Sequence, residues 1–242
     1  MKLTASKLKA VALIVLAMWS IAGFAQGEMM MYVMRNGAIV FQSPVSGIDS
    51  IVIKQTTNDD NCSFFDNPQG VVINGVRWAT RNVGAPGTFA SSPCDNGEYY
   101  QFNKDTTDFL LWSDYVNSVY ANSDTWLSAN DPSPAGWRVP TSDEIQKLID
   151  YNYVTYEWID SNGFTGGKFT DKATGNSIFL SAASYRSSYD GTLYNVGGHG
   201  YYWSSTVGDG GSAYFLGFGN ASATYWGYND RSFGFSVRPV AK

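Results

Sequence analysis

One segment of this sequence has a clear helical pattern, and the remaining apolar residues come in short runs separated by turn residues. Glu144 follows Thr141 by three residues, which is the spacing of a helix capping box. Ile145, Leu148 and Ile149 then form an apolar stripe at helical spacing. We therefore interpret Glu144 as a capping residue. The whole pattern predicts an α+β protein with short antiparallel strands, one or two helices and long loops.

Asn-Gly pairs between apolar runs predict two β-hairpins. Asn36-Gly37 lies within residues 31–42, and Asn74-Gly75 lies within residues 71–80. Such pairs supply the positive φ angles that a tight hairpin turn needs. In the last predicted strand, apolar and polar residues alternate, which predicts one buried face and one polar face. Further strands are predicted at 50–54, 97–102, 178–182, 201–205, 213–218 and 233–240.

Three segments lack a regular pattern. Residues 109–120 are predicted to form either a short helix or a loop that buries Trp112. Residues 184–200 and 219–231 are rich in Tyr, Asn, Gly and Ser, so they are predicted to be loops.

The first 25 residues have the pattern of a secretory signal peptide. Three lysines precede an apolar run at 10–22, and Gly23 and Ala25 are small residues suited to cleavage. The run is shorter than the about 20 apolar residues of a membrane-spanning helix, so an uncleaved anchor is the weaker alternative. We therefore predict a secreted or cell-surface protein without a membrane span in the mature chain.

The predicted mature chain consists of a short β segment at 26–56, a polar linker at 57–69 and a main domain at 70–242. Removing the leader changes the net charge from −5 to −8, because it removes three lysines and no acidic residue. An acidic chain does not suit binding to nucleic acid or to anionic membranes. No nucleic-acid partner is predicted.

Cys62 and Cys94 are the two cysteines of the chain. Because an exported protein meets oxidising conditions, we predict a disulfide between them. Two unpaired thiols are the alternative.

Five segments stand in a characteristic order: 72–83 (VINGVRWATRNV), 97–102 (GEYYQF), 131–141 (DPSPAGWRVPT), 201–205 (YYWSS) and 234–240 (GFSVRPV). Together they resemble the Fibrobacter succinogenes major paralogous domain, which is found in exported proteins of Bacteroidetes and Fibrobacteres. The resemblance covers about residues 70–242. It implies a C-type-lectin-like fold that is distantly similar to the formylglycine-generating enzymes.

Two departures from this resemblance bear on function. Ser133 stands where family members often carry Cys. The catalytic cysteines of the formylglycine-generating enzymes lie near the last strand, and here residues 233–240 contain none. That chemistry is therefore not predicted.

A serine hydrolase would need a histidine base beside its nucleophile. His199 is the one histidine of the chain, in a Gly-rich turn. Ser204 and Ser205 follow it in a predicted strand and not in a nucleophile elbow. No catalytic residue is predicted from this set.

The sequence gives little support for a glycoside hydrolase with paired carboxylates. It gives equally little support for a metal site. Glu98, Glu144 and Glu157 are available, but sequence spacing gives no separation between their carboxylates. One His and two separated Cys do not supply a zinc site, and the calcium triplets of lectins are missing. No metal and no cofactor is predicted.

The candidate ligand-binding residues are mostly aromatic side chains in polar, glycine-rich segments. Such rings offer a flat apolar face beside polar groups, which suits sugar or protein surfaces. The alternative is that they fold back and cover the core. The candidates are Tyr189, Tyr194, Tyr225, Trp226, Tyr228 and Asn229.

Residues within the five motifs have a structural interpretation. Trp78, Trp137 and Trp203 are predicted to lie in the core. Arg138 and Arg238 are predicted to donate to backbone carbonyls.

The sequence favours an exported, non-enzymatic binding module that recognises a glycan or a protein at or outside the cell surface. One alternative is a structural component of a surface appendage, whose N-terminal β segment pairs with a partner. A divergent hydrolase is the other alternative.

Overall fold

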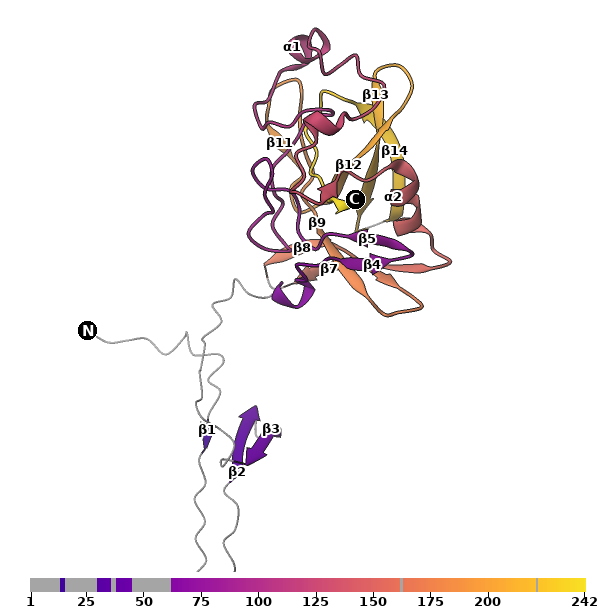
Figure 1. Ribbon diagram of the computed structural model, residues 1–242. Coiled ribbons are helices and arrows are strands. Elements are labelled where there is room, and N and C mark those ends of the chain that lie inside the picture. Colours follow the sequence, from indigo (N-terminus) through magenta and orange to yellow (C-terminus); the bar gives the residue numbers. More distant parts are fainter. Residues whose placement is uncertain (1–13, 16–29, 36–37, 45–61, 162, 221) are drawn as a thin grey trace, which may run out of the picture. The chain divides into compact units, whose positions relative to one another are not determined.

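The computed structural model describes residues 14–15, 30–35, 38–44, 62–161, 163–220 and 222–242 (Figure 1). The chain divides into two units, Met1–Gln55 and Thr56–Lys242, which are described separately. Among the described residues, antiparallel strands predominate and are accompanied by two short α-helices. The α+β class predicted from the sequence is thereby confirmed.

The described part of the smaller unit is an antiparallel sheet made of β1 (Ile14–Val15), β2 (Met30–Arg35) and β3 (Ala38–Pro44). Strands β2 and β3 pair with Arg35 opposite Ala38, so the hairpin predicted at 31–42 is confirmed. The predicted strand at 50–54 and most of the predicted signal peptide lie outside the described residues.

In the described part of the larger unit, the strands form four small sheets. Their orders are β4–β5–β15–β6, β7–β8–β9, β12–β13–β14 and β10–β11. The hairpin predicted at 71–80 and the strands predicted at 178–182, 201–205 and 213–218 are confirmed. The strand bounds are β4 (Val71–Ile73), β5 (Val76–Trp78), β6 (Trp137–Arg138), β7 (Val154–Ser161), β8 (Phe164–Asp171), β9 (Ser177–Ser181), β10 (Tyr185–Arg186), β11 (Leu193–Tyr194), β12 (His199–Val207), β13 (Ser212–Gly219), β14 (Ser222–Asp230) and β15 (Val240–Ala241).

The sheet β12–β13–β14 divides the domain core in two, because successive residues of its strands point to opposite faces. On β12, Tyr202 belongs to one apolar cluster and Trp203 to another. On β13, Leu216 belongs to the first cluster and Phe215 to the second. Tyr202 pairs with Leu216 and Trp203 with Phe215, so each cross-strand pair serves a single cluster. The first cluster also contains residues of β4, β5, β9 and α2.

Helix α2 (Ser142–Ile149) begins at the predicted capping box. Thr141 Oγ1 accepts from the Glu144 amide at 3.3 Å, and Glu144 Oε2 accepts from the Thr141 amide at 2.8 Å. Ile145 and Leu148 are buried in the first cluster. Arg138 donates to both Glu144 oxygens, at 2.8 and 2.6 Å, as well as to the Val139 carbonyl. Burial opposes ionisation of Glu144, but these bonds outweigh it and lower its pKa.

The C-terminal segment 233–241 is extended, but it pairs with several parts of the chain and not with one strand. Phe235 exchanges two backbone hydrogen bonds with Tyr100, at 2.9 and 3.0 Å. Gly234 exchanges two with Arg186, at 2.8 and 2.9 Å. Three more amides donate to carbonyls of this segment: Ala79 to Pro239, Val83 to Val237 and Trp203 to Ser236.

This pairing corrects two strand predictions. Residues 97–102 and 233–240 meet through a single bridge between Tyr100 and Phe235, and neither range is one continuous strand. The polar residues Ser236 and Arg238 of this range are as buried as Phe235. The segment has protein on both sides, so alternation does not separate core from solvent here.

The predicted loop at 219–231 is wrong as well. Residues Ser222–Asp230 form β14, which pairs antiparallel to β13. The turn-forming residues of this range suggested a loop, but pairing with a strongly apolar neighbouring strand stabilises the extended conformation. The predicted loop at 184–200 also contains the short strands β10 and β11.

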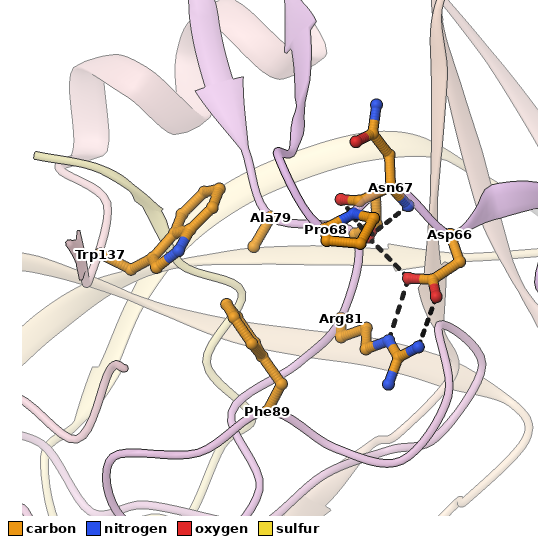
Figure 2. Close-up of a pocket in the computed structure, with 8 residues that line it drawn as sticks. Asp66, Asn67, Pro68, Ala79, Arg81, Phe89 and Trp137 are labelled. Carbon is orange, nitrogen blue, oxygen red and sulfur yellow. Dashed lines mark hydrogen bonds and ion pairs between the residues drawn. The ribbon is translucent and has the colours of Figure 1, made fainter. Parts of the chain in front are cut away.

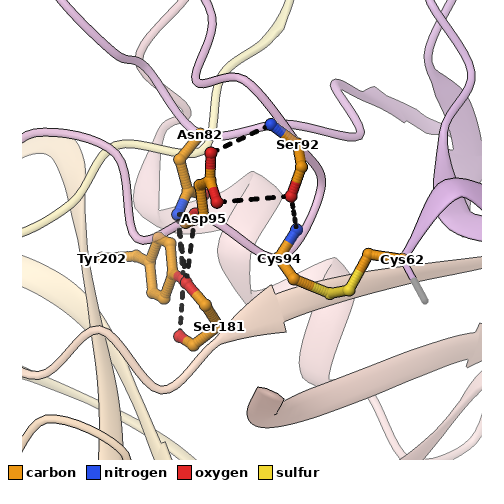
Figure 3. Close-up of a disulfide and its surroundings, with 7 residues drawn as sticks. All are labelled: Cys62, Asn82, Ser92, Cys94, Asp95, Ser181 and Tyr202. Carbon is orange, nitrogen blue, oxygen red and sulfur yellow. Dashed lines mark hydrogen bonds between the residues drawn. A yellow bond between two sulfur atoms is a disulfide. The ribbon is translucent and has the colours of Figure 1, made fainter. Parts of the chain in front are cut away.

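A disulfide and a buried polar network lie side by side in this domain (Figure 3). The structure confirms the disulfide Cys62–Cys94, whose Cα atoms are 5.8 Å apart. The Cys94 amide donates to Ser92 Oγ at 3.3 Å, and Asp95 accepts from the Ser92 amide at 3.1 Å. The bridge thus fastens residue 62, at the start of the described domain, to a loop that is held by its own side chains.

Asn82 is fully buried and connects this loop to the core. Its Nδ2 donates to the carbonyls of Asp95 and Asn96, at 3.0 and 2.9 Å, and its Oδ1 accepts from Arg238 Nε at 2.8 Å. Arg238 Nη1 donates to the Ala79 carbonyl at 3.2 Å, as predicted for this residue. Burial lowers the pKa of Arg238 to about 10, so the guanidinium stays protonated at neutral pH.

The three motif tryptophans divide into two groups. Trp78 and Trp203 are buried in the core, as predicted. Trp137 is only partly buried, so its predicted core position is wrong. Its ring lies edge-on against Phe89, with centroids 5.8 Å apart, at the wall of a surface pocket.

Removing the disulfide Cys62–Cys94 is expected to lower the free energy of unfolding by about 3–4 kcal/mol, because the bridge closes a loop with a sequence separation of 32. Denaturant unfolding of the wild type and of the Cys62→Ser, Cys94→Ser variant measures the difference. A reducing agent should produce the same loss in the wild type and none in the variant. Equal stability of the two proteins would contradict a closed bridge.

Candidate functional site

Several large apolar side chains are exposed around β10, β11 and helix α1 (Trp112–Val116). We call this set the aromatic surface. Tyr189 is 74% exposed and Trp112 is 47% exposed. Exposed apolar side chains that gather in one region indicate a contact surface more strongly than scattered ones do. The aromatic surface consists of Leu111, Trp112, Tyr189, Leu193 and Tyr194.

Stacked rings connect the aromatic surface to the second core cluster. The ring of Tyr194 stacks on that of Tyr185, with centroids 5.7 Å apart. Tyr185 in turn meets Phe233 edge-on at 5.6 Å, and Tyr189 meets the same Phe233 at 6.0 Å. Phe233 packs against the buried Phe235 at 6.4 Å. The exposed tyrosines therefore rest on rings that are fixed by the core.

Trp112 is fixed by hydrogen bonds from both its backbone and its side chain. Its amide donates to the Ser188 carbonyl at 2.9 Å, next to Tyr189. Its indole Nε1 donates to Asp230 Oδ2 at 3.3 Å, at the end of β14. Of the two alternatives predicted for 109–120, the structure shows a short helix, and Trp112 is exposed. In α1 the buried residue is Tyr115.

A cation–π contact adds to this connection. The Arg186 guanidinium lies 4.5 Å from the centroid of the Phe109 ring, and its Nε donates to the Gly191 carbonyl at 2.8 Å. Arg186 thus joins the segment before α1 to the turn between β10 and β11. Contacts of this kind stabilise partly exposed rings by about 0.5–1 kcal/mol.

One carboxylate beside the aromatic surface, that of Asp190, has a strongly shifted pKa. Asp190 Oδ2 accepts from the Tyr194 hydroxyl at 2.7 Å, and Oδ1 accepts from the Thr192 amide and hydroxyl. The hydrogen bond from Tyr194 is the main cause that lowers the pKa of Asp190 to about 2. A fixed anion beside exposed rings gives the surface a polar contact as well as an apolar one.

The structure brings together two of the six predicted ligand-binding residues, Tyr189 and Tyr194. Tyr228 is 65% exposed on β14 and packs edge-on against Tyr214 at 6.2 Å. Because alternate residues of a strand share a face, Tyr228 lies on the same face of β14 as Asp230, the partner of Trp112.

Of the remaining three predicted residues, only Asn229 has a side chain that the structure describes. The Asn229 side chain accepts from the amide of the next residue, Asp230, at 2.8 Å, so its carbonyl serves the local backbone. Tyr225 and Trp226 pair through the backbone with Gly217 and Leu216 of β13, and their side chains lie outside what the structure describes. The predicted loop position of all three residues is corrected to a strand position.

The candidate residues His199 and Ser204 have separate surroundings. His199 is exposed at the start of β12, and its ring lies beside that of Tyr201 with centroids 6.2 Å apart. Ser204 is fully buried and donates to the Tyr214 carbonyl at 2.8 Å. A nucleophile needs an accessible hydroxyl that donates to its base, which is not the role of Ser204 here.

The three candidate glutamates have separate surroundings. Glu144 is bound by Arg138 and by the start of α2. Glu157 lies on β7 and forms an ion pair with Lys168 at 3.5 Å. Glu98 is exposed in the segment after the disulfide-bonded loop.

Among the described residues, no three His, Cys, Asp or Glu side chains lie close enough together to hold a metal ion. No helix in that part of the chain has the length and apolar character needed to cross a membrane. Comparison with protein-family models, curated proteins and solved structures gives no match.

Replacing Tyr194 by Phe removes the hydroxyl that donates to Asp190, so the pKa of Asp190 is expected to rise from about 2 toward its ordinary value. An NMR titration of the carboxyl carbon measures this shift. The variant Tyr153→Phe, at another exposed tyrosine, is the matched control and should leave the pKa unchanged. An unchanged pKa in Tyr194→Phe would show that the hydrogen bond is absent in solution.

Proposed function

We propose that this protein is an exported, non-enzymatic binding module with a C-type-lectin-like fold. It docks onto a protein partner through the aromatic surface. The observation that carries this proposal is the set of exposed apolar side chains on α1 and β10–β11, fixed from beneath by hydrogen bonds and ring contacts.

The composition of the aromatic surface favours a protein partner over a glycan. Trp and Tyr dominate the binding energy of many protein interfaces, where they fill pockets of the partner. Leu111 and Leu193 add aliphatic area, which has no hydrogen-bonding capacity for sugar hydroxyls. Because the rings are already held in place, binding requires little additional ordering of side chains.

The lectin-like part of the proposal is supported by where two motif segments lie. The 131–141 segment leads directly into α2, and residues 234–240 close the domain by pairing with segments from its first half. The resemblance to the Fibrobacter succinogenes major paralogous domain implies a Trp-Arg-Val-Pro-Thr segment that leads into a helix and a Gly-Phe-Ser-Val-Arg segment that closes the domain, and both arrangements agree with this. The leader-like sequence of residues 1–25 supports export.

Trp112→Ala and Tyr189→Ala are each expected to weaken capture of the partner by about tenfold or more, because exposed aromatic anchors typically contribute about 2 kcal/mol or more. The measurement is cross-linked pull-down from the extracellular and envelope proteins of the producing cells, followed by titration of the captured protein. Tyr153→Ala, which removes a comparably exposed ring elsewhere, should bind like the wild type.

Two results would contradict the proposal. One is a partner that binds the wild type and both variants equally, since the aromatic surface would then take no part. The other is a glycan array on which binding is lost in the same variants while no protein is captured, which would replace the protein partner by a glycan.

A further inference from the structure

A pocket of about 230 Å³ lies in the larger unit, lined by residues that the aromatic surface does not use. Four parts of the chain meet in it: residues 66–68 shortly after Cys62, residues 79–81 directly after β5, Phe89, and Trp137 at the start of β6. Figure 2 shows two rings on one side and an ion pair on the other. The lining residues are Asp66, Asn67, Pro68, Ala79, Thr80, Arg81, Phe89 and Trp137.

The polar wall is a two-pronged ion pair between Arg81 and Asp66. Arg81 Nε donates to Asp66 Oδ1 at 2.9 Å, and Nη2 donates to Oδ2. Arg81 Nη1 donates to the carbonyls of Ala90 and Ser91, and Asp66 Oδ1 also accepts from Thr80 Oγ1 at 3.2 Å. Both charged side chains stay partly accessible, at 32% for Arg81 and 23% for Asp66.

This ion pair has one donor and one acceptor left side by side. A guanidinium has five N–H groups and a carboxylate has about four acceptor positions. Within the described part of the chain, the bonds above leave one N–H of Arg81 Nη2 and further acceptor capacity on Asp66 Oδ2. Two neighbouring hydroxyl groups match this arrangement, because one donates to the carboxylate and the other accepts from the guanidinium.

The apolar wall is built by Trp137 and Phe89, whose rings meet edge-on with centroids 5.8 Å apart. Gly70 makes room for the indole: it has a φ of +73°, and a Cβ there would lie 2.6 Å from Trp137 Cη2. A side chain at position 70 would therefore displace Trp137 from the pocket. Gly70 thus leaves the space that the indole of Trp137 occupies.

We infer that this pocket binds a single neutral pyranose ring that carries two adjacent free hydroxyl groups. The C–H face of the sugar lies against Trp137 and Phe89, and its hydroxyls bind the Arg81–Asp66 pair. The ligand is neutral because the two charges of the pocket cancel, so neither an anion nor a cation gains a net attraction. The volume suits one small ring, and a few placed polar groups are enough to orient it. This inference does not depend on the aromatic surface.

The test is saturation-transfer NMR of the purified protein with the methyl pyranosides of glucose, galactose and mannose, each at about 10 mM, where weak single-ring sites are occupied. At least one pyranoside should receive saturation and should shift the indole signal of Trp137. Asp66→Asn keeps the shape of the side chain and is expected to weaken binding by about tenfold or more. Trp137→Ala should abolish binding.

The matched control is Tyr153→Ala, which removes an exposed ring outside both the pocket and the aromatic surface and should bind the sugar like the wild type. Thermal unfolding of each variant separates loss of the site from loss of the fold. If Trp137→Ala is unfolded, the sugar affinity of Asp66→Asn alone tests the inference. The inference is overturned if no pyranoside binds the wild type, or if Asp66→Asn binds as tightly as the wild type. Tighter binding of the anionic methyl glucuronide than of methyl glucoside would contradict the inference that the ligand is neutral.

Discussion

The backbone hydrogen bonds of the C-terminal segment 233–241 are the constraint on which the rest of the larger unit depends. Through them, residues near 80, 100, 186 and 203 are held around one extended piece of chain. Few of these residues lie in long strands. Without this segment, their backbone N–H and C=O groups would lack the hydrogen-bond partners that a neighbouring strand supplies. It runs beside a sheet that is buried on both faces, and it places Phe235 and Val237 in the same cluster as Trp203.

Two candidate binding regions follow from this arrangement. The pairing of Gly234 with Arg186 fixes the base of β10–β11, so Tyr189 and Tyr194 are presented on a rigid support. The bond from the Ala79 amide to Pro239 fixes the end of β5, where the pocket walls begin. Irregular segments can therefore carry preorganised surfaces, because their geometry is set by long-range pairing.

The sequence was informative where structure is local. The capping box at Thr141 and the turn at Asn74-Gly75 depend on neighbouring residues, and both were predicted correctly. Strand β14 and the bridge at Tyr100 depend on distant partners, so their sequences alone did not identify them. Tyr189 and Tyr194 were recognised as candidates by their polar surroundings. Trp112 was missed, because only the position of Ser188 and Asp230 shows that its ring is held at the surface.

Native-state hydrogen exchange tests the role of the C-terminal segment most directly. The amides of Val83, Tyr100, Arg186, Trp203 and Phe235 all bond to it or belong to it. They are expected to be protected and to exchange with the same free energy of opening, as members of one cooperative unit. Rapid, independent exchange at Tyr100 and Arg186, with Trp203 still protected, would contradict the claim that this segment holds the domain together.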